Sequence, residues 1–157
     1  MPLFNVGELL TVAIKDEITG IAFYKALAAK TRLPHVASAL VAISKQEERH
    51  KDRFARMLQD VGAYQPSETY TGEYDAYMRA LLDTRAFASL EAAARNAATI
   101  GSDRDGLAMA LRLENEALIF YNELRQLVPP THEHYVEEVI REERDHLVEI
   151  ARLMKTL

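Results

Sequence analysis

Residues 36–61 read VASALVAISKQEERHKDRFARMLQDV, and this stretch gives the clearest indication of the architecture. Its apolar side chains recur at alternating steps of four and three residues, the spacing of the core-facing stripe of a bundle helix. Two polar residues, Glu47 and His50, occupy the middle of that stripe. The pattern therefore predicts a long helix that carries a carboxylate and an imidazole on its buried face.

Three other stretches, residues 6–30, 103–128 and 131–157, show the same periodicity. Each has a glutamate at a stripe position near its middle, and the last one repeats the Glu-x-x-His spacing. The residues predicted to face the centre of a bundle are therefore Glu17, Glu47, His50, Glu114, Glu143 and His146. The remaining histidines lie near helix starts without this spacing and are predicted to be surface residues: His35, His132 and His134.

We predict an all-α, ferritin-like antiparallel four-helix bundle in a single domain, residues 1–157. Two helical hairpins are separated by a crossover that is long enough to run back along the bundle and that contains short helices near 73–82 and 89–100. The predicted first hairpin, crossover and second hairpin are residues 5–62, 63–102 and 103–157.

Capping residues mark the predicted helix starts. Asn5 and Glu8 have the spacing of a capping box, and Ser102 or Asp103 can cap the third long helix. Thr131, directly after two prolines, is predicted to cap the last helix, which is expected to reach the C-terminus.

The chain is internally repeated. Residues 14–24 resemble residues 111–121, because both contain a glutamate followed by a Phe-Tyr pair that ends seven positions later. Residues 47–50 likewise resemble residues 143–146. The two hairpins are thus predicted to be copies related by a pseudo-two-fold axis. The repeat places three nearby glutamates outside the central set, either solvated or touching it: Glu48, Glu116 and Glu142.

The chemistry of the central set points to metal. Four carboxylates in an apolar bundle would repel one another and lose their hydration, whereas two divalent cations balance their charge. One Glu from each of two helices, with Glu-x-x-His from the other two, is the pattern of di-iron and di-manganese carboxylate bundles. We predict two Fe ions, with Mn or Zn as possible occupants, and expect Glu47 and Glu143 to bridge them.

Tyr24 and Tyr121 follow Glu17 and Glu114 by seven residues, on the same helix face two turns away. Two interpretations remain open. They are ordinary core tyrosines, or their phenols donate hydrogen bonds to ligand carboxylates across the bundle and orient them.

Composition excludes several classes of site and partner. The 157 residues include no cysteine, which rules out disulfides, zinc ribbons and Cys-ligated iron–sulfur centres within them. A formal net charge of −5 argues against nucleic acid and anionic membranes as partners. No apolar run could span a bilayer and no secretory signal is recognisable, so we expect a cytoplasmic location.

Together, Glu17…Tyr24, Glu47-x-x-His50, Glu114…Tyr121 and Glu143-x-x-His146 resemble the rubrerythrin branch of the ferritin-like superfamily. The resemblance covers all four long helices. It implies a di-iron centre between the hairpins, a homodimer, and reduction of hydrogen peroxide, with related members oxidising and storing iron.

Two departures from that family stand out. Rubrerythrins end in a rubredoxin domain whose four cysteines bind iron and pass electrons, whereas these residues contain no cysteine. We therefore expect a stand-alone di-iron domain that receives electrons from an external donor such as a rubredoxin-like protein. Rubrerythrins also carry a further Glu three residues after the ligand that corresponds to Glu114. Here that position is Ala117, its counterpart in the first helix is Gly20, and the six-ligand set is symmetric, similar to that of bacterioferritins.

Three functions follow as hypotheses. The chain is a non-haem redox enzyme that reduces peroxide or dioxygen, or it oxidises and stores or transfers iron. In the third, it is a scaffold whose metal only holds the bundle together.

Overall fold

The computed structural model describes residues 5–66 and 72–157, and none of these residues lies in a strand. Two shorter helices, α3 (Gly72–Asp83) and α4 (Leu90–Thr99), connect two pairs of long ones, and a short 3-10 turn (Pro130–His132) precedes the last helix. The long helices are α1 (Val6–Lys30), α2 (Pro34–Val61), α5 (Asp103–Leu127) and α6 (Glu133–Met154).

Local sequence explains most of the helix starts. The backbone N–H of Glu8 donates to Asn5 Oδ1 at 2.8 Å, and the N–H of Asn5 donates to Glu8 Oε2 at 3.1 Å, which completes the capping box. Pro34 occupies the first turn of α2, where its missing N–H costs no helical hydrogen bond. Ser102 caps α5 by accepting from the N–H of Asp105 at 3.1 Å.

The predicted start of the last helix is wrong. Thr131 lies inside the 3-10 turn, where the N–H of His132 donates to the carbonyl of Pro129 at 2.8 Å. His132 is the residue at the helix cap, and its side chain makes no capping hydrogen bond. The two consecutive prolines favour a tight turn that takes up Thr131 before the α-helix begins. The helix also ends at Met154, short of the C-terminal Leu157.

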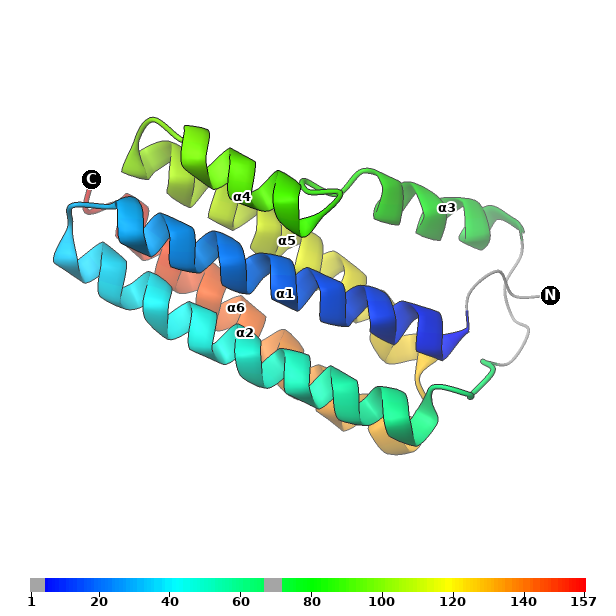
Figure 1. Ribbon diagram of the computed structural model, residues 1–157. Coiled ribbons are helices and arrows are strands. Elements are labelled where there is room, and N and C mark those ends of the chain that lie inside the picture. The colour runs from blue at the N-terminus through cyan, green and yellow to red at the C-terminus, as the bar shows by residue number, and fades with distance from the viewer. Residues whose placement is uncertain (1–4, 67–71) are drawn as a thin grey trace.

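The long helices form two antiparallel hairpins, α1 with α2 and α5 with α6, which pack against each other (Figure 1). The connection between α2 and α5 carries α3 and α4 back along one side of the bundle, and α4 packs against α1 (Figure 1). The predicted all-α bundle of two hairpins joined by a long crossover is confirmed.

The core consists of two apolar clusters at opposite ends of a polar layer. One contains Leu10, Phe54 and Leu124, and the other contains Leu40 and Leu107. Between them lie the buried glutamates and histidines. None of the described helices is both long and apolar enough to span a membrane.

The crossover is fastened over α1 and α5 by polar contacts. Arg85, between α3 and α4, forms an ion pair with Asp16 on α1. The N–H of Ala86 donates to both carboxylate oxygens of Glu116 on α5, at 3.0 and 2.9 Å. These contacts hold the segment between α3 and α4 above the polar layer of the bundle.

Candidate metal centre

The six residues predicted from the helical stripe meet in one buried layer at mid-length of the bundle. Each is at most 5% exposed, although carboxylates and imidazoles ordinarily prefer solvent. On α2 and α6, the three-residue step places each Glu and His on the same face, one turn apart. The residues come from all four long helices: Glu17 on α1, Glu47 and His50 on α2, Glu114 on α5, and Glu143 and His146 on α6.

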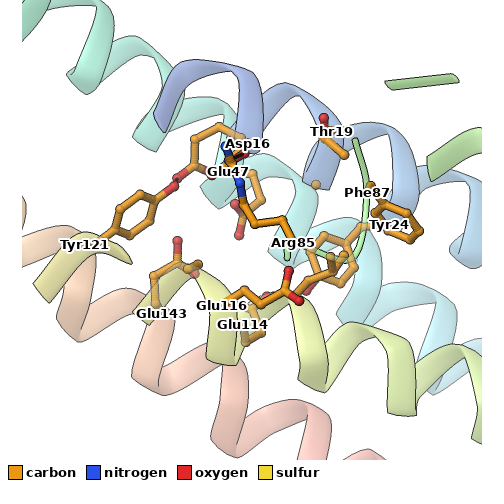
Figure 2. Close-up of a pocket in the computed structure, with 14 residues that line it drawn as sticks. Asp16, Thr19, Tyr24, Glu47, Arg85, Phe87, Glu114, Glu116, Tyr121 and Glu143 are labelled. Atoms are coloured by element: carbon orange, nitrogen blue, oxygen red, sulfur yellow. Dashed lines mark hydrogen bonds and ion pairs between the residues drawn. The ribbon is translucent and has the colours of Figure 1, made fainter. Parts of the chain in front are cut away.

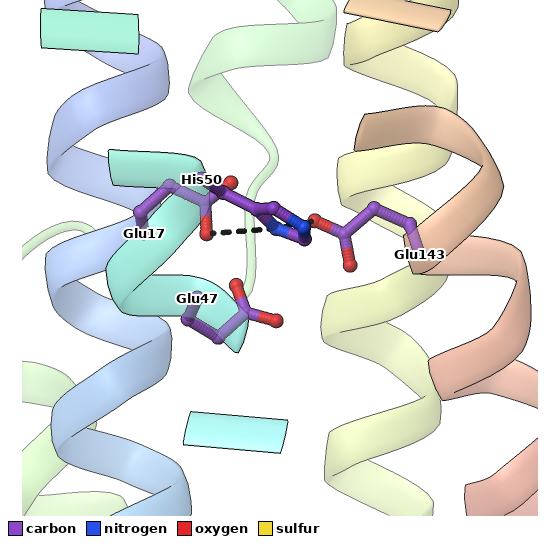
Figure 3. A group of neighbouring side chains, drawn as sticks. All are labelled: Glu17, Glu47, His50 and Glu143. Atoms are coloured by element: carbon purple, nitrogen blue, oxygen red, sulfur yellow. Dashed lines mark ion pairs between the residues drawn. The ribbon is translucent and has the colours of Figure 1, made fainter. Parts of the chain in front are cut away.

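Their potential ligand atoms form two overlapping groups, and within each group one atom of every residue lies within 4.8 Å of the others. Both groups include Glu47 and Glu143, which is the arrangement that two bridging carboxylates require. Figure 3 shows Glu17 and Glu143 approaching His50 from opposite sides. The first group is Glu17, Glu47, His50 and Glu143; the second is Glu47, Glu114, Glu143 and His146.

Both imidazoles turn the same nitrogen toward the carboxylates. His50 Nδ1 lies 3.3 Å from Glu143 Oε1. His146 Nδ1 lies 2.9 Å from Glu143 Oε2 and 3.0 Å from Glu47 Oε1. Nδ1 is therefore the nitrogen that each ring offers to a metal, and Nε2 lies on the outer side.

The contacts of the two Nε2 atoms include Gln46, a residue that the sequence analysis did not predict to lie at the site. His146 Nε2 lies 2.7 Å from Gln46 Oε1, and His50 Nε2 lies 3.1 Å from Glu142 Oε2. Gln46 precedes Glu47 just as Glu142 precedes Glu143, so the internal repeat contained a signal that pairs the two positions. Both lie outside the two ligand groups, as do Glu48 and Glu116.

The two tyrosines make reciprocal contacts between the hairpins. The hydroxyl of Tyr121 on α5 donates to Glu17 on α1 at 2.5 Å, and the hydroxyl of Tyr24 on α1 donates to Glu114 on α5. Both rings are buried, and Tyr121 packs against Phe54 with their centroids 5.0 Å apart. Both interpretations of these residues therefore apply at once, because the rings fill the core while the phenols hold carboxylates.

Three histidines lie apart from the cluster. His35 and His134 are exposed, and His132 is half-buried with its Nε2 3.9 Å from Asp60.

Burial dominates the electrostatics of the cluster. Burial raises the pKa of Glu17 well above its usual range, and the charge of Glu47 adds to this effect. Burial raises the pKa of Glu114 to about 8, with the charge of Glu143 contributing. Burial also acts to raise the pKa of Glu143, but hydrogen bonds with His146 and His50 outweigh it and leave that pKa low.

The pKa values of both histidines are raised. Burial alone would lower them, but hydrogen bonding to Glu143 outweighs it for His50, and hydrogen bonding to Glu114 and Glu143 outweighs it for His146. Without a metal, protons on the imidazoles thus take the place of part of the missing positive charge.

Several buried ligand atoms of the cluster lack a hydrogen bond of good geometry, which is consistent with atoms that serve as ligands of cations. An unpaired buried polar atom costs about 1–3 kcal/mol, and more when it is charged. Two divalent ions would balance four carboxylates, and an oxygen-rich set with one nitrogen per ion suits iron. The cluster fits two iron ions. The cluster atoms that form no hydrogen bond of good geometry are Glu17 Oε2, Glu47 Oε1, His50 Nδ1 and Glu143 Oε1. Ion-pair contacts remain, since His50 Nδ1 and Glu143 Oε1 lie 3.3 Å from each other and Glu47 Oε1 lies 3.0 Å from His146 Nδ1.

A small pocket opens onto the carboxylates (Figure 2). It leaves about 50 Å³ for the centres of water-sized molecules, and Gly20 on α1 and Ala117 on α5 form part of its wall. Arg85 and Phe87 of the crossover line this pocket and also a larger outer cavity of about 650 Å³. These two side chains, with Asp16 and Thr19, therefore lie where the two cavities adjoin.

Comparison with known proteins agrees with this geometry. Residues 8–100 match the family model described as Rubrerythrin, a segment that includes Glu17, Glu47 and His50. A proposed ferritin-like diiron-carboxylate protein from Thermotoga maritima has a similar crystal structure, with a TM-score of 0.73 and 19% sequence identity. The similarity covers 97% of this chain and 95% of that one, and it shows that the fold is ferritin-like. No curated protein matches the chain.

Proposed function

This chain belongs to the rubrerythrin family, and from that premise we propose that it is a di-iron oxidoreductase. In this proposal it reduces hydrogen peroxide or dioxygen with electrons from an external donor. One observation carries it: four buried carboxylates and two buried imidazoles converge in one layer, and a small pocket opens onto them.

The proposed ligands divide into two halves that share two carboxylates. Glu17 and His50 would hold one ion and Glu114 and His146 the other, while Glu47 and Glu143, which belong to both groups, would serve both ions. When bound, two ferrous ions supply the two electrons that, with two protons, convert hydrogen peroxide into two waters. The chain balances the charge of the ions, and Tyr24 and Tyr121 orient two of the carboxylates.

The pocket beside the carboxylates is small, with about 50 Å³ for the centres of water-sized molecules. Glu17, Glu47, Glu114 and Glu143 line it, so bound ions would take up part of this space. Gly20 and Ala117 lack long side chains and leave this space open beside Glu47 and Glu114. So little free space favours small oxidants such as hydrogen peroxide and dioxygen.

The source of electrons lies outside these residues. They contain no cysteine with which to hold a rubredoxin-type iron, so a rubredoxin-like protein or a small reductant is proposed as the donor. From the family resemblance we also propose a homodimer.

Iron oxidation with transfer or storage is a second candidate. The observation that favours it is the symmetric set of four glutamates and two histidines, with Ala117 where rubrerythrins have a further carboxylate. In this function ferrous iron is the substrate. Storage requires a large hollow shell, so the native mass separates the two candidates, and a dimer argues against storage.

The proposal can be tested by mixing the anaerobic ferrous protein with peroxide or dioxygen in a stopped-flow spectrometer. We expect both oxidants to change the iron absorption, and turnover to require a supplied reductant. His146→Ala should abolish this reactivity, while His35→Ala, at an exposed histidine outside the cluster, should retain it. If neither oxidant changes the iron within minutes, the scaffold function is favoured instead.

A further inference from the structure

The two histidines of the cluster have chemically different hydrogen-bond partners at Nε2, the nitrogen that faces away from the carboxylates. His50 Nε2 lies 3.1 Å from a carboxylate oxygen of Glu142, whereas His146 Nε2 lies 2.7 Å from the amide oxygen of Gln46. Each contact crosses between α2 and α6. The atoms that face Nε2 are a carboxylate oxygen and an amide oxygen, which only accept, so in each contact Nε2–H is the donor.

The difference is a break in an otherwise repeated pattern. His50 and His146 occupy equivalent positions of the two hairpins, as do Glu47 and Glu143. The residue before each of these glutamates contacts the histidine of the opposite hairpin. The two contacts therefore occupy equivalent positions in the two hairpins. The two contacts differ in charge, because one copy of the repeat has Glu142 and the other has Gln46, and in length, 3.1 Å against 2.7 Å.

We propose that Glu142 and Gln46 make the two metal positions inequivalent, the His50 half being the stronger site for a divalent cation. This inference rests on the proposed metal-binding function of the cluster. Glu142 acts here as a positioning residue: it would not touch the metal, and it would act through the imidazole of His50.

The physical basis is the strength of the hydrogen-bond acceptor. A carboxylate pulls the Nε2 proton more strongly than an amide oxygen does, which makes Nδ1 a stronger donor to a cation. The negative charge of Glu142 also attracts a divalent ion directly. Arg49 lies 3.7 Å from Glu142 and the glutamate side chain is 32% exposed, so part of this attraction is screened.

The first metal ion should therefore enter the His50 half. Removing an outer partner of a ligating histidine typically costs about 10- to 100-fold in metal affinity. The two stepwise dissociation constants should differ by a factor in this range, and equalising the two outer partners should bring them together.

Cobalt(II) is a suitable probe, because each bound ion shifts the NMR signal of the Nε2 proton on its histidine far from the normal range. The metal-free protein is titrated with Co²⁺, and the two shifted Nε2–H signals are followed together with visible absorption. The variants are Glu142→Gln and Gln46→Glu, each close in shape to the native residue. Glu138→Gln on the same helix is the control, since Glu138 pairs with Arg53 and not with a histidine.

In the native protein and in Glu138→Gln, we expect one shifted signal to fill before the other. In Glu142→Gln the signal that fills first in the native protein should change its position and no longer fill before the other. The first dissociation constant should increase about 10- to 100-fold. In Gln46→Glu the His146 half should bind Co²⁺ more tightly, so that its signal fills together with that of the His50 half. Signals that rise together in the native protein, or an order that Glu142→Gln leaves unchanged, would overturn the inference while the metal site stands. Fewer than two Co²⁺ per native chain would overturn the proposed metal site itself, and the inference with it.

Discussion

The hydroxyl of Tyr121 on α5 donates a 2.5 Å hydrogen bond to Glu17 on α1, so a phenol of one hairpin holds a carboxylate of the other. Tyr24 makes the same contact in the opposite direction, to Glu114. One seven-residue spacing, present once in each hairpin, therefore produces two crossed bonds at the metal layer. They orient both non-shared carboxylates and join the hairpins where the core is most polar.

Replacement of Tyr121 by Phe should lower the metal affinity more than the stability of the fold. The ring still packs against Phe54, but the Glu17 carboxylate loses the hydrogen bond from the phenol. A hydrogen bond to a charged group contributes about 1.5–3 kcal/mol. We expect roughly 10- to 100-fold weaker metal binding by chelator competition. Tyr135→Phe, at an exposed tyrosine, is the control. Equal affinities of Tyr121→Phe and the native protein would show that the phenol does not orient the carboxylate.

Metal removal should make stability strongly dependent on pH. The pKa of Glu114 rises to about 8 and that of Glu17 rises also, so the folded metal-free protein binds more protons than the unfolded chain above about pH 4.5. The raised pKa values of His50 and His146 act in the same direction above their usual value. The lowered pKa of Glu143 acts in the opposite direction, but only below about pH 4.5. Stability should therefore fall as the pH rises from about 5 to 8.

The expected loss is several kcal/mol, and each kcal/mol lowers Tm by about 2–4 °C for a chain of this size. Thermal unfolding of the chelated protein across this pH range measures it. The metal-loaded protein serves as the control, because bound cations compensate the carboxylates and its Tm should vary little. A chelated sample that melts at the metal-loaded temperature at pH 8 would contradict the prediction.

Replacement of Arg85 by Ala should speed metal exchange. Arg85 lines both the pocket beside the carboxylates and the outer cavity, and its pairing with Asp16 keeps it in place between them. Loss of this side chain widens the passage without removing a proposed ligand. We expect a faster rate of Co²⁺ extraction by a chelator, with two ions per chain still bound at saturation.

Arg112→Ala is a matched control for that experiment. Arg112 bonds Glu116, another residue of the pocket wall, but it is 55% exposed and does not line either cavity. Its extraction rate should equal that of the native protein. Equal rates for Arg85→Ala and Arg112→Ala would mean that metal exchanges by another route.

Replacement of Ala117 by Glu should change the choice of oxidant. Ala117 lines the pocket beside Glu114, and rubrerythrins have a carboxylate at the corresponding position. We expect the ratio of the peroxide rate to the dioxygen rate to rise, as measured by stopped-flow mixing of the ferrous protein. Ala117→Gln, similar in size but uncharged, separates the effect of charge from that of filling the pocket. A ratio that changes equally in both variants would assign the effect to volume.

Most helix boundaries and the central residues could be predicted from the chain because they are local properties; the exceptions are the start and the end of α6. Apolar spacing defines the buried face of each helix, and any polar residue on that face, such as Glu47 or His50, must lie inside. The internal repeat then separated Glu114 from Glu116 and Glu143 from Glu142. The family model independently covers the first hairpin and the crossover.

The contacts between helices could not be predicted in this way. Periodicity says which face of α2 is buried, but the partner of a side chain depends on the axial shift and rotation of helices packed against each other. That Gln46 reaches His146 depends on this packing, and that Arg85 lines the pocket depends on the path of the non-helical segment between α3 and α4. The buried layer of glutamates and histidines could therefore be predicted from the sequence. Its outer hydrogen bonds and its access route depend on how the two hairpins and the crossover pack together.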